Sequence, residues 1–78
     1  MYRSKIRNMN NKIKERLNEL LEEKNITPYK LSIDLSVSRS VVHYWLTGKT
    51  TPNADYIIKL CEYFGVSSDF LLGVSDNY

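Results

Sequence analysis

Cysteine and histidine are scarce in this sequence, because each occurs once among 78 residues. A single cysteine excludes a disulfide framework within the chain, and two such ligands are too few for a Cys/His metal cluster. No apolar run approaches the ~20 residues of a membrane span, and the first residues lack the apolar stretch of a signal peptide. We therefore expect a cytoplasmic protein with no metal, no cofactor and no membrane partner.

Glycine and proline are also few, three and two residues respectively, and no flexible linker divides the chain. We expect residues 1–78 to form one domain with its core at about 12–73, because a second core would leave neither half enough apolar surface. A domain of this size has little room for an enclosing substrate pocket. Glycine-rich phosphate loops and strained nucleophile turns are missing as well. The sequence thus predicts a protein that is not an enzyme.

The net charge of +2 is too small to indicate a nucleic-acid partner by itself. Its distribution is uneven, since residues 1–16 carry six Lys and Arg and a single acid. Such a basic side suits a phosphate-bearing partner, and it fits a solvated helix face equally well. Residues 1–11 are read either as the first turns of a long helix or as a basic arm that follows a nucleic-acid backbone. The spacing of Ile6, Met9 and Ile13 favours the helix.

Apolar periodicity predicts an all-α chain of five helices, because no segment alternates with the period of two that a strand needs. Ile13, Leu17 and Leu20 share one face of the first helix, and Asn25, which tolerates the left-handed conformation, ends it. The fourth and fifth helices follow the N-cap residues Asn53 and Ser67. The apolar residues assigned to these two helices are Ala54, Ile57, Ile58, Leu60, Cys61, Phe64, Phe70, Leu71 and Leu72.

Two short helices separated by about three residues are predicted in the middle of the chain. One covers Pro28–Leu35 after the N-cap Thr27, and the other covers Arg39–Leu46 after the N-cap Ser38. This is the arrangement of a helix-turn-helix motif, which projects its second helix from a compact body. The side chains expected to face the core are Leu31, Leu35, Ile33 in part, Val37, Val42, Trp45 and Leu46.

The outward side of the helix at Arg39–Leu46 contains no Lys, Asp or Glu, the residues that usually fill exposed helix positions. Arg39 can make two hydrogen bonds to guanine, Ser40 can serve either base edge, and Val41 can touch a thymine methyl group. Tyr44 lies one turn later and reaches a base edge or a phosphate. These four residues are candidates for reading bases in a DNA major groove, and an ordinary solvated surface is the alternative.

Short strings of residues occur in a fixed order along the chain. They are Thr27–Ser32, Val37–Ser40, Trp45–Lys49, Pro52, Ile58–Leu60, Tyr63–Ser67 and Asp69–Gly73. Together they resemble the Cro and phage-repressor (Xre-type) helix-turn-helix DNA-binding family over about Lys12 to Gly73. The resemblance implies a compact five-helix bundle of the lambda-repressor-like type.

The resemblance also implies which residues touch DNA. It assigns base reading to Arg39, Ser40, Val41 and Tyr44, and phosphate contacts to Thr27, Lys30, His43, Lys49 and Thr50. Ser38 joins the phosphate set because backbone amides at a helix N-terminus bind phosphate. The chain departs from the family at Pro28, where many members have a Gln that holds the DNA backbone, and at Ser36, where Gly is usual. If Ser36 takes a positive φ, the serine costs on the order of 1 kcal/mol.

The expected function is sequence-specific binding of double-stranded DNA by a homodimer on a symmetric operator, since a second half-site adds specificity. The resemblance implies transcriptional regulation, and we expect a repressor-like regulator. The residues assigned to the dimer surface are Phe70, Leu71, Val74 and Tyr78. The alternative is a protein-interaction module, such as an antitoxin-like regulator that binds its toxin.

Overall fold

The computed structural model describes the backbone of residues 2–78 and the side chains of residues 12–78. Within that part of the chain, five helices and no strand are present, as the sequence predicts. The helices are α1 (Tyr2–Glu23), α2 (Pro28–Leu35), α3 (Arg39–Thr47), α4 (Ala54–Phe64) and α5 (Ser68–Leu71). α1 begins at Tyr2, so the backbone of residues 2–11 belongs to this helix.

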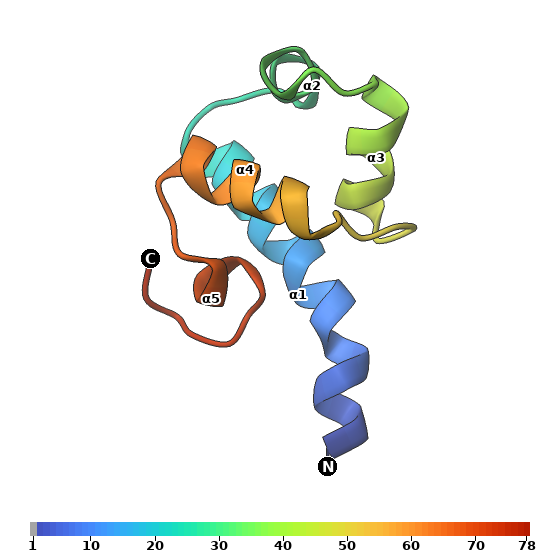
Figure 1. Ribbon diagram of the computed structural model, residues 1–78, viewed down its shortest axis with the longest axis vertical. Helices are drawn as coiled ribbons and strands as arrows, with labels where there is room; N and C mark the ends of the chain where they lie inside the picture. The colour runs from blue at the N-terminus through green and yellow to red at the C-terminus, as the bar shows by residue number, and fades with distance from the viewer. Residues whose placement is uncertain (1) are drawn as a thin grey trace.

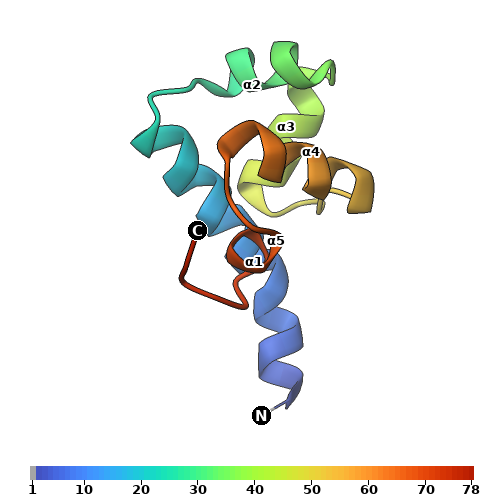
Figure 2. The same cartoon turned by 60° about the vertical axis from the view of Figure 1, so that its left-hand side comes forward.

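The arrangement places α2 and α3 together at one end of the molecule (Figures 1 and 2). α1 contacts α3 and α5, α2 contacts α3, and α4 contacts α5. The side chain of Asn18 on α1 donates hydrogen bonds to the carbonyl oxygens of Lys14 at 2.8 Å and Leu46 at 3.0 Å. The second of these bonds fastens the C-terminal end of α3 to α1, so α3 is held while its opposite face stays exposed.

Four of the five helices begin at an N-cap that the sequence predicts. The side chains of Thr27, Ser38, Asn53 and Ser67 each accept a hydrogen bond from the backbone N–H three residues later, at 3.0–3.2 Å. Each bond satisfies an amide that has no partner within its helix. These helix starts are therefore fixed by local chemistry.

The core is built from one face of each helix. Its fully buried side chains are Leu17, Leu20, Leu31, Val42, Leu60 and Leu71. Trp45 is 3% exposed, and its ring lies 5.3 Å from that of Tyr56 on α4. The inner face of α3 is thus anchored in the centre of the domain.

Two apolar residues predicted to be on the core side lie on the surface instead. Ile33 is 53% exposed and Ile58 is 56% exposed. Ile33 lies two residues after the core-facing Leu31, and Ile58 lies two residues before the core-facing Leu60. Two residues correspond to a rotation of about 200° around a helix, so each isoleucine faces away from the core. Both prediction errors follow from this rotation. Ala54, in the first turn of α4, is also exposed.

The predicted dimer surface is wrong for two of its four residues. Phe70 and Leu71 are 3% and 0% exposed, so they belong to the core of the single chain. The ring of Phe70 is contacted by the guanidinium of Arg16, 4.3 Å from its centroid, and by the ring of Tyr78 at 4.7 Å. Val74 and Tyr78 remain exposed.

The segment after α5 folds back and covers Phe70. The backbone N–H of Ser67 donates to the carbonyl oxygen of Tyr78 at 2.6 Å, and Arg16 pairs with Asp76 at 2.8 Å. The hydroxyl of Tyr78 donates to the Glu23 carboxylate on α1, which raises the pKa of Tyr78. Long-range contacts of this kind are invisible to helix periodicity, which explains the error.

Ser36, between α2 and α3, has φ 57° and ψ 44°, the left-handed conformation considered in the sequence analysis. A non-glycine residue there costs ~1–2 kcal/mol. We expect Ser36→Gly to raise the free energy of unfolding by about 0.5–1 kcal/mol, because relief of this strain exceeds the conformational entropy that glycine loses on folding. Urea denaturation followed by circular dichroism measures the change.

Glu19→Gly provides a control of opposite sign. Glu19 is exposed within α1, one turn before the helix ends at Glu23, and glycine there should cost about 1 kcal/mol. If Ser36→Gly lowers the free energy of unfolding as Glu19→Gly does, the strain of the left-handed conformation at Ser36 is smaller than the conformational entropy that glycine loses on folding.

Candidate nucleic-acid interface

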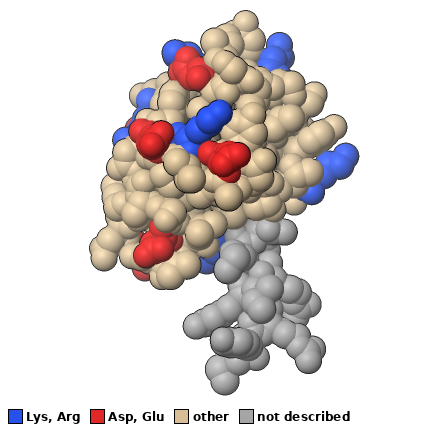
Figure 3. All heavy atoms as spheres, viewed as in Figure 1, with Lys and Arg blue, Asp and Glu red and all other residues tan. Residues whose placement is uncertain are grey.

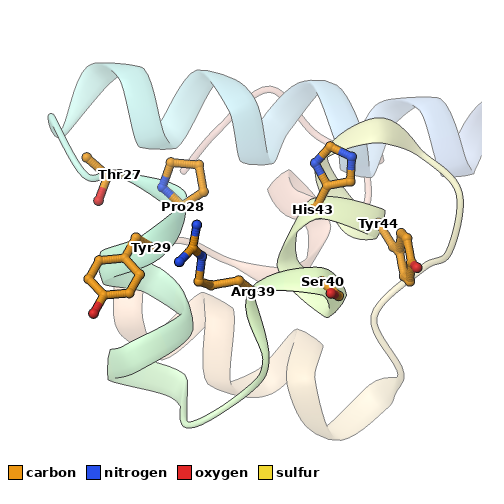
Figure 4. Close-up of a pocket in the computed structure, with 7 residues that line it drawn as sticks. All are labelled: Thr27, Pro28, Tyr29, Arg39, Ser40, His43 and Tyr44. Carbon is orange, nitrogen blue, oxygen red and sulfur yellow. The ribbon is translucent and has the colours of Figure 1, made fainter.

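A groove of about 680 Å³ lies between the start of α2 and the outer face of α3. The residues that line it are Thr27, Pro28, Tyr29, Arg39, Ser40, His43 and Tyr44. Figure 4 shows these side chains facing the open side of the two helices, with Arg39 reaching from α3 towards Pro28 and Tyr29. The groove therefore joins residues of both helices of the motif in one surface, and no carboxylate is among the lining residues.

Three of the four predicted base readers line this groove. Arg39 and Ser40 are exposed, and Tyr44 is half-buried. Val41 is different, because it is half-buried, packs against the core and does not line the groove. It lies one turn before the buried Trp45, and residues four apart share a helix face. Val41 therefore faces the flank of α3 nearer the core.

Five of the six predicted phosphate contacts fall into two groups, and Lys30 is described below. Thr27, Ser38 and His43 are exposed at the two helix starts and on α3. Lys49 and Thr50 follow α3, where both of their backbone amides donate to the carbonyl oxygen of Tyr44, at 2.9 and 3.3 Å. These bonds hold the loop against the C-terminal end of α3.

Lys49 also interacts with a predicted base reader. Its ammonium lies 4.7 Å from the centroid of the Tyr44 ring, within the ~6 Å range of a cation–π attraction. The same ring is 6.2 Å from that of His43. Tyr44 thus has two defined neighbours, and one of them is a cation.

Charged side chains are unevenly spread over the surface. Figure 3 shows acidic side chains from the upper to the lower part of the face on which α4 lies, with basic side chains among them and at the rim, whereas the edge on the side of α3 shows basic side chains and no acidic ones. An anionic partner would meet repulsion over the α4 face. No such repulsion by acidic side chains is expected at the edge formed by α3.

Lys30 is held by residues behind the groove. Its ammonium contacts both carboxylate oxygens of Asp34 at 2.9 Å, and the hydroxyl of Tyr63 on α4 donates to the same carboxylate at 2.5 Å. These two hydrogen bonds, that of Tyr63 first, lower the pKa of Asp34. In return, the carboxylate raises the pKa of Tyr63 to about 12. Lys30 is 61% exposed, yet part of its charge is compensated by Asp34.

Removal of the Asp34 charge should strengthen DNA binding. In Asp34→Asn, Lys30 loses its ion-pair partner and becomes available to a phosphate. We expect a several-fold higher affinity at low salt, and a salt slope that steepens by about 0.9 if Lys30 gains a phosphate. Titration of labelled duplex at several salt concentrations measures both quantities.

Asp69→Asn is the matched control, because Asp69 lies on α5, away from α2 and α3 (Figure 1). It removes one negative charge from the same protein and should leave the salt slope unchanged. Equal gains in the two variants would mean that only net charge matters and that Lys30 touches no phosphate.

Tyr29 is a groove residue that the sequence pattern alone does not single out. It is 56% exposed and its ring lies 5.2 Å from the guanidinium carbon of Arg39. The available signal was its position directly after Thr27 and Pro28, which places it in the first turn of α2. That signal gives no information about Arg39, which comes ten residues later.

The comparisons with known proteins agree with this geometry. The sequence pattern of the helix-turn-helix family matches residues 17–71. The chain belongs to this family, in its Cro and phage-repressor (Xre) branch. The match covers α2, α3 and α4 and ends with α5.

A curated relative is the HTH-type transcriptional activator BcrR of Enterococcus faecalis, 36% identical over 58 residues. The alignment covers 74% of this chain and 28% of BcrR, so the chain spans about a quarter of that protein's length. No solved structure gives a significant match. In residues 2–78, no helix has the length and apolar character needed to cross a membrane.

Proposed function

We propose that this chain binds double-stranded DNA sequence-specifically and regulates transcription. The observation that carries the proposal is the groove between α2 and α3, where Arg39, Ser40 and Tyr44 lie together and no carboxylate is among the lining residues. Membership of the helix-turn-helix family and the relative named as a transcriptional activator support the same function.

In this proposal, α3 enters the major groove. A helix with its side chains is about 10–12 Å wide and the major groove is about 12 Å wide, so α3 fits with its outer face towards the bases. Arg39 and Ser40, in the first turn, read base edges, and Tyr44 reads a base or reaches a phosphate. Val41 takes part only at the flank, because it leans towards the core. The DNA phosphates on either side of the major groove are held by Thr27, Ser38, His43, Lys49 and Thr50. Lys30 adds a further phosphate contact, which its ion pair with Asp34 weakens.

A homodimer on a symmetric operator remains our proposal for the assembly. Two copies of α3 about 34–36 Å apart would occupy successive turns of the major groove. Val74 and Tyr78 are the exposed residues of the predicted dimer surface. Selection of bound duplexes from a random pool tests this directly, because inverted half-sites about ten base pairs apart are expected and a single unrepeated site contradicts the dimer.

We further propose that binding is repressor-like, with the bound protein excluding the transcription machinery from an overlapping promoter. A reporter gene placed behind the selected operator measures this. Lower expression in the presence of the protein is expected, whereas higher expression would assign to this chain the role named for BcrR.

The salt dependence of binding separates a DNA-binding protein from a protein-interaction module. Each phosphate neutralised contributes about −0.9 to the slope of log affinity against log salt concentration. We expect a steep negative slope for the selected duplex. A flat response, or no binding to any duplex at low salt, would contradict the DNA proposal and favour a protein partner.

A further inference from the structure

Arg39 is a cation at the first position of α3, where the helix dipole places partial positive charge. Among residues 12–78, none of the ion pairs involves Arg39. The contact that it makes is with the ring of Tyr29, 5.2 Å from the guanidinium carbon to the ring centroid. Figure 4 shows the Arg39 side chain crossing from α3 to lie beside Pro28 and Tyr29.

The backbone of Tyr29 is fixed, although its side chain is exposed. The hydroxyl of Ser32 donates to the Tyr29 carbonyl oxygen at 2.6 Å, and Ser32 is only 3% exposed. The N-cap at Thr27 and the ring of Pro28 define the same turn. Tyr29 as a whole residue is 56% exposed and does not belong to the core. An aromatic ring thus stands at a defined place on the wall of the groove without a packing role.

An aromatic partner and an acidic partner would affect Arg39 differently. A carboxylate would accept the in-plane N–H donors of the guanidinium, the same donors that a guanine needs for its two hydrogen bonds. A ring attracts the cation through its face and leaves those donors free. Tyr29 can therefore hold Arg39 across the groove without occupying the atoms that read a base.

We propose that Tyr29 is a positioning residue for Arg39, so that base preference at the position read by Arg39 depends on the Tyr29 ring. The proposal rests on the DNA-binding function proposed above. A held guanidinium loses less rotamer freedom when it binds a base than a free one does, and the preference for the correct base increases accordingly.

The test compares Tyr29→Leu, Tyr29→Phe, Arg39→Ala and the double variant Tyr29→Leu/Arg39→Ala. The dissociation constant is measured for the selected duplex and for duplexes in which each base pair is changed singly. We expect Tyr29→Leu to weaken discrimination about 2- to 5-fold, the factor that corresponds to an exposed cation–π contact, at the same base pair that Arg39→Ala affects. Tyr29→Phe keeps the ring and should keep the preference. The double variant should match Arg39→Ala.

Ile33→Ala is the matched control, because Ile33 is an exposed residue one turn further along the same helix and does not line the groove, and it should leave the preference unchanged. The ring-current shift of the Arg39 side-chain protons in the free protein, present in Tyr29→Phe and lost in Tyr29→Leu, tests the contact without DNA.

Three results would overturn the inference while the DNA-binding proposal stands. They are an equal loss for all duplexes in Tyr29→Leu, an equal loss in Tyr29→Phe and Tyr29→Leu, or additive effects in the double variant. If the wild-type protein has no base preference, the proposed function itself fails and the inference fails with it.

Discussion

Trp45→Ala should lower the free energy of unfolding by about 3–5 kcal/mol, the usual cost of deleting a buried aromatic side chain. Trp45 is 3% exposed and packs on Tyr56, so its loss leaves a cavity between α3 and α4. A chain of this length has a total stability of roughly 4–12 kcal/mol. The variant should therefore be marginally folded, and its thermal midpoint should fall by more than about 10 °C.

Circular dichroism in urea is the suitable measurement for this variant, because Trp45 is the single tryptophan and its fluorescence disappears with it. Ser40→Ala, on the exposed side of the same helix, should change stability by less than about 0.5 kcal/mol. A loss below 1 kcal/mol in Trp45→Ala would mean that α3 is not anchored through its inner face.

Arg39→Ala should cost about 1–3 kcal/mol of discrimination at one base pair, since this is the usual contribution of a bidentate contact to guanine in the major groove of DNA. Arg39 is exposed, so its removal should leave the fold unchanged. The measurement is the affinity for the selected duplex and for each single base-pair change. The variant's affinities for the selected duplex and for the singly changed duplexes should differ less than those of the wild-type protein.

Lys49→Ala is the control for Arg39→Ala, because it removes an expected phosphate contact and no base contact. Lys49 lies beyond α3 and is expected to contact a phosphate, so its loss should weaken all duplexes similarly and reduce the salt slope by about 0.9. If Arg39→Ala and Lys49→Ala both lower affinity without altering base preference, Arg39 does not read bases and the assignment of the reading edge is wrong.

Features that depend on neighbouring residues could be predicted from the sequence. Thr27 and Ser38 start α2 and α3 because their side chains reach the backbone amide three residues later. Asn25 and Ser36 have positive φ between successive helices. The buried positions Val42 and Trp45 follow from helical spacing within α3. The short connector at residues 36–38 keeps α3 next to α2, so the side of α3 opposite its buried residues can be predicted to be exposed.

Features that depend on distant residues could not be predicted. Phe70 was assigned to an exposed ridge, because nothing in the pattern of α5 indicates that Arg16 and Tyr78 cover it. Tyr63 and Asp34 are 29 residues apart, and the bond between them, which restrains Lys30, exists because the fold brings these residues of α4 and α2 together. Neither contact leaves a trace in periodicity or capping.

The sequence by itself thus determined the five helices, the starts of α2 to α5, and the residues that α3 turns outward with the exception of Val41, since each depends on interactions within a few residues along the chain. The tertiary structure decided which apolar residues are buried, how much of the Lys30 charge is compensated by Asp34, and that Tyr29 faces Arg39 across the groove. Those outcomes depend on how whole helices pack against one another, and packing brings together side chains that the sequence keeps far apart.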